Sequence, residues 1–135
     1  MLAIEQLIPH RAPMRWVEEL LDCTDTTATA ATRFTAEHFA VADGTVIETA
    51  LVECMAQTVA AALGQRMRAR GTSGAANHGM LAAVSNFKIL TPPPLDQTLT
   101  IEVREVKRLG PMLMIAGKIS CGADVIATGD LSLYA

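Results

Sequence analysis

The fold of this chain is decided by residues 46–70, which read VIETALVECMAQTVAAALGQRMRAR. The stretch has no proline and a single glycine, and most of its residues are good helix formers. At its start Thr45 and Glu48 fit a capping box, with Thr45 as the N-cap residue, and Gly71 after its end is a natural stop. Apolar side chains cover much of its circumference, so we expect one long helix that other elements wrap and bury.

Strand patterns flank this helix on both sides. The turns between the later strands are short and contain glycine, which predicts an antiparallel sheet. A single buried helix with such a sheet indicates an α+β hotdog fold, in which the sheet curls around the helix. The length suits one such domain over residues 1–135. The predicted elements are a helical turn at residues 3–8, strands at 15–23, 26–34, 80–89, 98–106, 112–121 and 125–134, and a loop at 71–79.

The composition argues against several classes of function. A net charge of −3 gives no electrostatic footprint for a nucleic acid. The three cysteines have no Cys-x-x-Cys spacing, so we expect no disulfide framework and no zinc or other metal site, and we place the protein in the reducing cytoplasm. The longest apolar run, residues 55–64, is much shorter than the ~20 residues of a membrane span, and the N-terminus lacks a signal-peptide pattern.

Four segments, in the right order along the chain, resemble the hotdog-fold dehydratases that act on 3-hydroxyacyl chains of acyl carrier protein. The best of them is ECMAQ at residues 53–57, which resembles the Glu-Ala-Met-Ala-Gln helix motif of that family. The others are LIPHRAPM at 7–14, which is similar to Leu-Pro-His-Arg-x-Pro, HF at 38–39, which resembles the start of His-Phe-Pro-Gly, and NFKI at 86–89 followed by PLDQTL at 94–99.

Two departures from the family pattern fall near the expected site. The family has Pro-Gly after His-Phe, where this chain has Ala40 and Val41. It has a second Pro-Gly just before the helix, where this chain has Ile47 and Glu48. These differences resemble a divergent branch, the dehydratase-like proteins found with aryl-polyene pathways.

The resemblance implies an acid–base site. His38 would be the base that removes the C2 proton, and Glu53 the acid that protonates the departing hydroxyl, with the pair formed across a dimer interface. We expect burial to keep Glu53 neutral, and Gln57 one turn later to orient it by a hydrogen bond. Free N–H groups near Glu48 and Thr49 would hold the thioester carbonyl oxygen.

Other reactive side chains receive structural interpretations. His10 lies between two prolines and is expected to fix that turn, and His78 stands in the predicted loop without supporting context. Cys54 points away from Glu53 around the helix and is expected to be a core residue. The arginines at 66, 68 and 70 have two readings, a helix end or a docking spot for an acidic partner.

The resemblance also implies partners. The substrate would be an acyl thioester on acyl carrier protein, the expected assembly is a homodimer or higher homo-oligomer, and no cofactor is expected because eliminating water needs only an acid and a base. Two alternatives stay open. One is a hotdog thioesterase, in which the helix carboxylate activates water. The other is a non-catalytic subunit that supports an active homologue, which the lost glycines favour.

Overall fold

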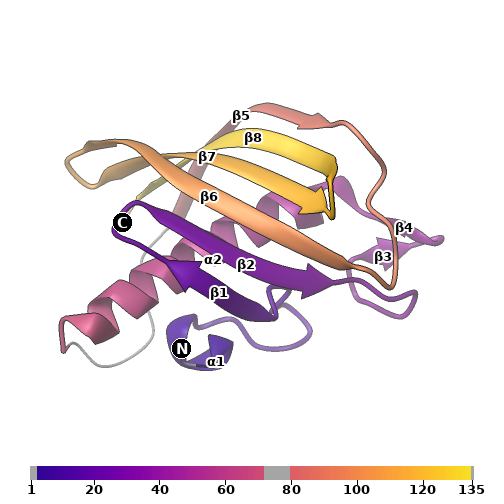
Figure 1. Cartoon of the computed structure of the whole chain (residues 1–135), viewed down its shortest axis with the longest axis horizontal. Helices are drawn as coiled ribbons and strands as arrows, with labels where there is room; N and C mark the ends of the chain where they lie inside the picture. The colour runs from indigo at the N-terminus through magenta and orange to yellow at the C-terminus, as the bar shows by residue number, and fades with distance from the viewer. Residues whose placement is uncertain (1–2, 72–79, 135) are drawn as a thin grey trace.

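The computed structural model describes residues 3–71 and 80–134 and has the α+β architecture expected from the sequence (Figure 1). The predicted loop, with His78, lies outside the described residues except for its first position. A six-stranded sheet and a two-stranded hairpin accompany the helices. In chain order the elements are α1 (Ile4–Leu7), β1 (Glu19–Cys23), β2 (Thr27–Arg33), β3 (Val41–Ala42), β4 (Thr45–Val46), α2 (Glu48–Ala69), β5 (Met80–Ile89), β6 (Thr98–Leu109), β7 (Met112–Cys121) and β8 (Asp124–Tyr134).

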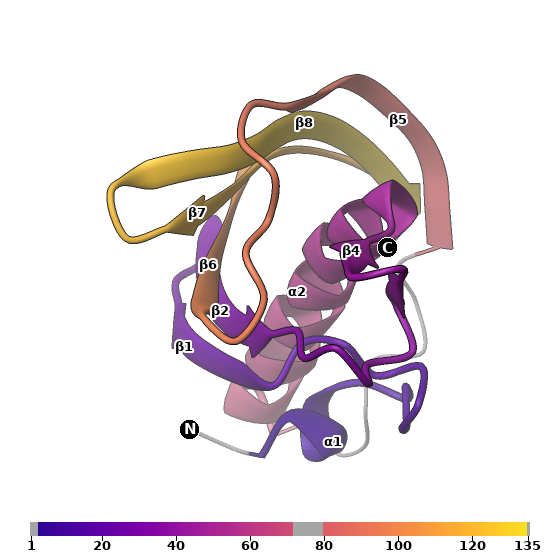
Figure 2. The same ribbon diagram turned by 90° about the vertical axis from the view of Figure 1, so that its right-hand side faces the viewer.

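The large sheet has the strand order β1-β2-β6-β7-β8-β5, and every neighbouring pair is antiparallel. Gly110 and Gly122, with φ values of 59° and 58°, supply left-handed residues to the tight β6–β7 and β7–β8 turns. The sheet curves strongly, and Figure 2 shows it wrapping around α2. This is the predicted hotdog arrangement.

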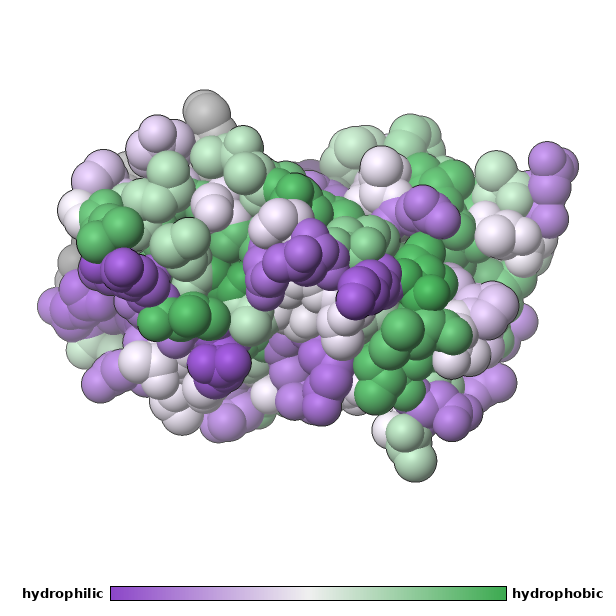
Figure 3. Space-filling view, turned by 90° about the horizontal axis from the view of Figure 1, so that it is seen from above, coloured by the Kyte–Doolittle hydropathy of each residue, from purple (hydrophilic) through white to green (hydrophobic). Residues whose placement is uncertain are grey.

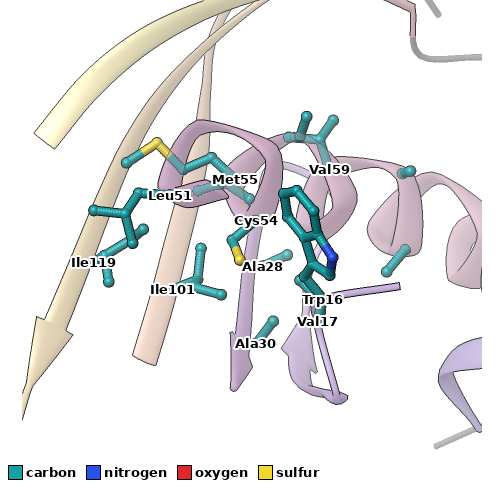
Figure 4. Close-up of a cluster of buried hydrophobic side chains, with 14 of the residues drawn as sticks. Trp16, Val17, Ala28, Ala30, Leu51, Cys54, Met55, Val59, Ile101 and Ile119 are labelled. Carbon is teal, nitrogen blue, oxygen red and sulfur yellow. The ribbon is translucent and has the colours of Figure 1, made fainter. Parts of the chain in front are cut away.

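The inner face of the sheet buries α2. Leu51, Cys54 and Met55 of the helix are fully buried, and Ile101 of β6 and Ile119 of β7 reach them from the sheet (Figure 4). Burying one such aliphatic side chain contributes about 1.5–3 kcal/mol, so the helix and sheet stabilise each other mainly through this contact. The prediction of a buried helix is confirmed.

The start of α2 differs from the prediction, and the capping box is wrong. Thr45 belongs to β4, and the N-cap residue is Ile47, which makes no side-chain cap hydrogen bond. Asp43 and Gly44 both have positive φ, 53° and 74°, which is the backbone of a type I′ hairpin turn. This turn pairs β3 with β4, and the pairing draws Thr45 into a strand.

The end of α2 follows the prediction. Arg70 is the C-cap residue, and Gly71 follows with a φ of 82°, the left-handed conformation that favours glycine after a helix. Neither helix in the described part of the chain has the length and apolarity that a membrane crossing requires.

Candidate active site

Glu53 stands on the one flank of α2 that the core leaves open. Its side chain is 36% exposed, although its neighbours Leu51 and Cys54 are fully buried. The Oε1 atom of Glu53 lies 3.6 Å from Nε2 of His10. The side chain of Glu53 is therefore less buried than the sequence led us to expect, and water reaches it.

His10 lies beside Glu53, a contact that the sequence analysis did not predict. Its backbone is held by Arg11, whose guanidinium donates to the carbonyl oxygens of Glu5, Ile8 and His10 at 2.8–2.9 Å. Its Nδ1 atom is buried and has no hydrogen-bond partner among the described residues. The signal was present in the His-Arg pair of the N-terminal motif, but nothing in the sequence indicated that this turn lies against α2.

Gln57 serves a purpose other than the predicted one. Its side-chain oxygen accepts the N–H groups of Trp16 at 2.9 Å and Val17 at 3.1 Å, and its Nε2 donates to the carbonyl oxygen of Met14 at 2.9 Å. No hydrogen bond of the described residues joins it to Glu53. The reason is that an extended backbone segment lies beside the helix at this point and occupies the amide, so Gln57 fastens that segment to α2.

His38 lies in the loop between β2 and β3. Its Nδ1 atom accepts the backbone N–H of Ala40 at 2.9 Å. The ring packs edge-on against Phe34, with 4.7 Å between ring centroids, and more loosely against Trp16 at 6.3 Å. Burial lowers the pKa of the His38 imidazole, and the carboxylate of Glu18 opposes part of that shift. His38 is therefore neutral near pH 7.

A surface cavity of about 350 Å³ opens beside His38. Arg15 and Arg33 supply cationic groups to its wall, and Trp16 and Phe39 supply apolar surface. Phe39 is 62% exposed, which is unusual for so large an apolar side chain. Glu18 adds one carboxylate, so the cavity combines apolar walls with two cationic groups and one anionic group.

The structure does not join the two predicted catalytic residues within one chain. No hydrogen bond or ion pair of the described residues connects His38 with Glu53. His38 contacts Phe34 and Ala40, whereas Glu53 faces His10. His38 and Glu53 of one chain therefore lie in separate environments with different neighbours.

The start of α2 leaves backbone donors unused. The first backbone bond there runs from the N–H of Ala50 to the carbonyl of Ile47, and the described residues offer the N–H groups of Glu48 and Thr49 no partner. These groups lie at the positive end of the helix dipole. The Glu48 side chain is exposed and makes no cap, so the predicted capping role of its carboxylate is absent.

The other reactive side chains singled out in the sequence make contacts that belong to the fold. Cys54 is fully buried, and burial, with a smaller contribution from Glu53, raises the pKa of its thiol well above the usual range, so it is a core residue as predicted. Arg66 and Arg68 donate to the carbonyl oxygens of Thr24 and Gln6, which favours the helix-end reading of the basic run. No group of metal-ligating side chains occurs within residues 3–71 and 80–134.

Solved structures confirm the fold. The chain is similar to the dehydratase heterocomplex ApeI:P from Xenorhabdus doucetiae, with a TM-score of 0.88 and 24% identity over 99% of this chain and 91% of that one. It is also similar to a hypothetical thioesterase with coenzyme A from Streptococcus pneumoniae, with a TM-score of 0.67 and 14% identity over 86% of both chains. A third similar structure is the PaaI protein of E. coli, with a TM-score of 0.66 and 11% identity over 87% of this chain and 82% of that one.

Sequence comparison reaches further than these structural likenesses. No curated protein matches the chain. The family model for ApeP-like proteins, described as ApeP dehydratase, matches residues 2–135. Because that match spans nearly the whole sequence, the chain belongs to the ApeP-like family of dehydratases.

Proposed function

We propose that this protein dehydrates a 3-hydroxyacyl thioester on acyl carrier protein to the trans-2-enoyl thioester. The observation that carries the proposal is the Glu53 carboxylate, which stays 36% exposed on a helix that is otherwise largely buried. A carboxylate left open on a helix that is otherwise buried is accessible to a substrate, and the chain that carries it belongs to a dehydratase family.

The reaction asks for three contributions from the protein. The C2 proton must be removed, the departing 3-hydroxyl must gain a proton, and donors must hold the thioester carbonyl oxygen while charge builds on it. We assign His38 and Glu53 to the reacting carbons, and the free N–H groups of Glu48 and Thr49 to the carbonyl oxygen. Elimination of water needs only an acid and a base, and we propose no cofactor.

The site is proposed to form between two chains. The separate surroundings of His38 and Glu53 within one chain support this arrangement. The sheet also offers an open edge at β5, where Leu81, Val84 and the following Leu90 are exposed. Figure 3, which views the molecule from the side of β5 and β8, shows hydrophobic patches between hydrophilic residues. A second chain on this edge would cover apolar surface.

The cavity beside His38 supports acyl carrier protein as the carrier of the substrate. Arg15 and Arg33 in its wall suit the phosphate of a carrier arm, and the apolar surface of Phe39 suits the arm itself. A cytoplasmic location is suited by the three cysteines, which form no disulfide: Cys23, Cys54 and Cys121.

A non-catalytic role in a larger assembly is the second candidate. The observation in its favour is that the similar Xenorhabdus doucetiae structure is a dehydratase heterocomplex. Under this hypothesis the protein alone would not turn over substrate, and turnover would require a second, different chain that carries the active site.

The test uses the purified protein with a 3-hydroxyacyl-pantetheine thioester and follows the absorbance of the conjugated enoyl product. Glu53→Gln should lower the rate about 1,000-fold, whereas Glu102→Gln, which breaks an exposed ion pair with Lys118 on the outer face of the sheet, should leave the rate unchanged. Release of free thiol without enoyl product would instead identify a thioesterase. Turnover only after a second hotdog chain is added would identify the supporting subunit.

A further inference from the structure

We propose that the backbone N–H of Ala40 fixes His38 as a hydrogen-bond donor, so that Glu53 carries out both proton transfers of the dehydration. The inference rests on the proposed function and changes the roles within it. It reverses the sequence-based expectation, in which His38 is the base and Glu53 is only the acid.

The first step concerns the nitrogen atoms of His38. A neutral imidazole has one N–H donor and one acceptor nitrogen. Nδ1 is the acceptor here, because it receives the Ala40 N–H at 2.9 Å, so the hydrogen of the neutral ring is on Nε2. Nε2 then has no lone pair for a substrate proton, and losing its own hydrogen would leave an imidazolate. The neutral ring can therefore donate a hydrogen bond but cannot act as the base.

The second step is that the Ala40 donor is held firmly. Ala40 is fully buried, and its carbonyl oxygen accepts the N–H of Ile47 at 2.9 Å. The N–H of Val41 donates to the carbonyl of His38 at 3.0 Å and closes the same turn. The motif that this stretch resembles has proline at position 40, and proline has no N–H to offer. The alanine therefore supplies a donor where the motif lacks one.

The third step concerns the surroundings of Glu53. Its side chain is 36% exposed on α2, so a substrate can reach the carboxylate. His10 lies 3.6 Å away and is held in place by the hydrogen bonds of Arg11 around it. Because the neutral His38 ring cannot take the C2 proton, the Glu53 carboxylate is left as the group that accepts it.

The proposed reaction balances with these roles. The Glu53 carboxylate of one chain takes the C2 proton, and the electron pair of the C2–H bond forms the C2–C3 double bond. The C3–O bond breaks, and the hydroxyl takes the same proton from Glu53 and leaves as water. The Nε2–H of His38, from the other chain, donates to the thioester carbonyl oxygen while charge builds on it. Glu53 returns to its ionised state.

Two substitutions at position 38 separate the donor from the base. A glutamine side chain can donate near the position of Nε2 but cannot accept a proton, and leucine can do neither. We expect His38→Gln to keep about a third of the wild-type kcat. We expect the kcat of His38→Leu to fall about 100-fold, which is the effect of removing one hydrogen-bond donor to an oxyanion. If His38→Gln is as inactive as His38→Leu while Glu53→Gln is also inactive, the role assignment is overturned and the proposed function stands.

A measurement without turnover tests the same point. Two-bond ¹H–¹⁵N correlation spectra of the uniformly labelled protein report which ring nitrogen of each histidine carries hydrogen, and comparison with His38→Gln assigns the signal. We expect His38 to be protonated at Nε2 and bare at Nδ1 near pH 7. A hydrogen on Nδ1 would overturn the inference. Absence of enoyl product from wild-type protein, or full activity of Glu53→Gln, would instead remove the proposed function itself.

Discussion

At the scale of single residues, the burial of the His38 imidazole links folding to pH. Burial lowers the pKa of the His38 imidazole in the folded protein below the ordinary value of about 6.5, despite the opposing effect of Glu18. The unfolded chain therefore binds a proton at this residue before the folded protein does, as the pH falls. Its contribution to stability is complete above about pH 6.5 and is lost as the pH falls toward the folded pKa.

The first prediction follows from this linkage. Urea unfolding of wild-type protein at pH 7.5 and at pH 5.0 should show a loss of stability on acidification, and His38→Gln should show a smaller loss because glutamine does not titrate. The comparison between the two proteins cancels the contributions of the other groups. Equal losses in both proteins would show that His38 does not resist protonation in the folded state.

Some features of the candidate site could be predicted from the sequence, and others could not. Glu53 could be singled out as a candidate, because a carboxylate between apolar helix residues and inside a recognisable motif is unusual. The contacts of His10 and Gln57 could not be predicted, because they depend on the N-terminal segment lying along α2, about 40 residues away in the chain. The departure at Ala40 was visible in the sequence, but its consequence depends on the turn that brings the N–H to Nδ1.

At the scale of elements, the N-terminal segment and α2 form a unit that depends on Gln57. The Gln57 side chain is 1% exposed and satisfies three backbone groups, those of Met14, Trp16 and Val17. An unsatisfied buried polar group costs about 1–3 kcal/mol. We expect Gln57→Leu to lower the free energy of unfolding by roughly 2–4 kcal/mol, as measured by urea denaturation.

Gln65 on the same helix provides the matched control for this second prediction. Its side-chain oxygen is buried and has no hydrogen-bond partner among the described residues. Gln65→Leu removes that unsatisfied oxygen and should be neutral or slightly stabilising. A loss of stability equal to that of Gln57→Leu would mean that the hydrogen bonds of Gln57 are not the source of its effect.

The single glycine of α2 is the subject of the third prediction. Glycine inside a helix costs about 1 kcal/mol relative to alanine, so Gly64→Ala should stabilise the helix by itself. A Cβ atom at this position, however, would collide with the backbone carbonyl of Leu7 in α1. Overpacking against backbone costs typically about 1–3 kcal/mol, so we expect a net loss of about 1–2 kcal/mol in thermal or urea unfolding. A gain of about 1 kcal/mol would contradict the close approach of α1.

The helices and strands were more predictable than their boundaries. Long periodic segments, such as α2 and β6 to β8, carry their pattern over ten or more residues, and the structure has them where the sequence placed them. The start of α2 failed because two local signals competed for Thr45. The Asp43–Gly44 turn, whose positive φ angles close a hairpin, prevailed over the capping box.

At the scale of the whole molecule, the two edge strands of the curved sheet differ in length and in charge. β1 is a short edge of 5 residues that carries two carboxylates, Glu19 and Asp22. β5 is an edge of 10 residues in which Lys88 is the only charged residue. Charged side chains on short edges protect a sheet against pairing, whereas a long apolar edge invites it. We therefore propose β5 as the edge on which a second chain pairs.

The last prediction tests that choice of edge. Val84 on β5 is 40% exposed and Leu21 on β1 is 48% exposed, so the two positions are matched in character and differ in the edge they occupy. A charge at an interface between apolar strands must be desolvated, and in a symmetric dimer it meets its own copy. We expect Val84→Lys to elute as a species of half the wild-type mass in size-exclusion chromatography with light scattering, and Leu21→Lys to elute with the wild type. The dissociated variant should also lose dehydratase activity, because the proposed site takes His38 from one chain and Glu53 from the other. An intact assembly in Val84→Lys together with dissociation of Leu21→Lys would place the interface on β1, and a monomeric but fully active protein would mean that both residues act within one chain.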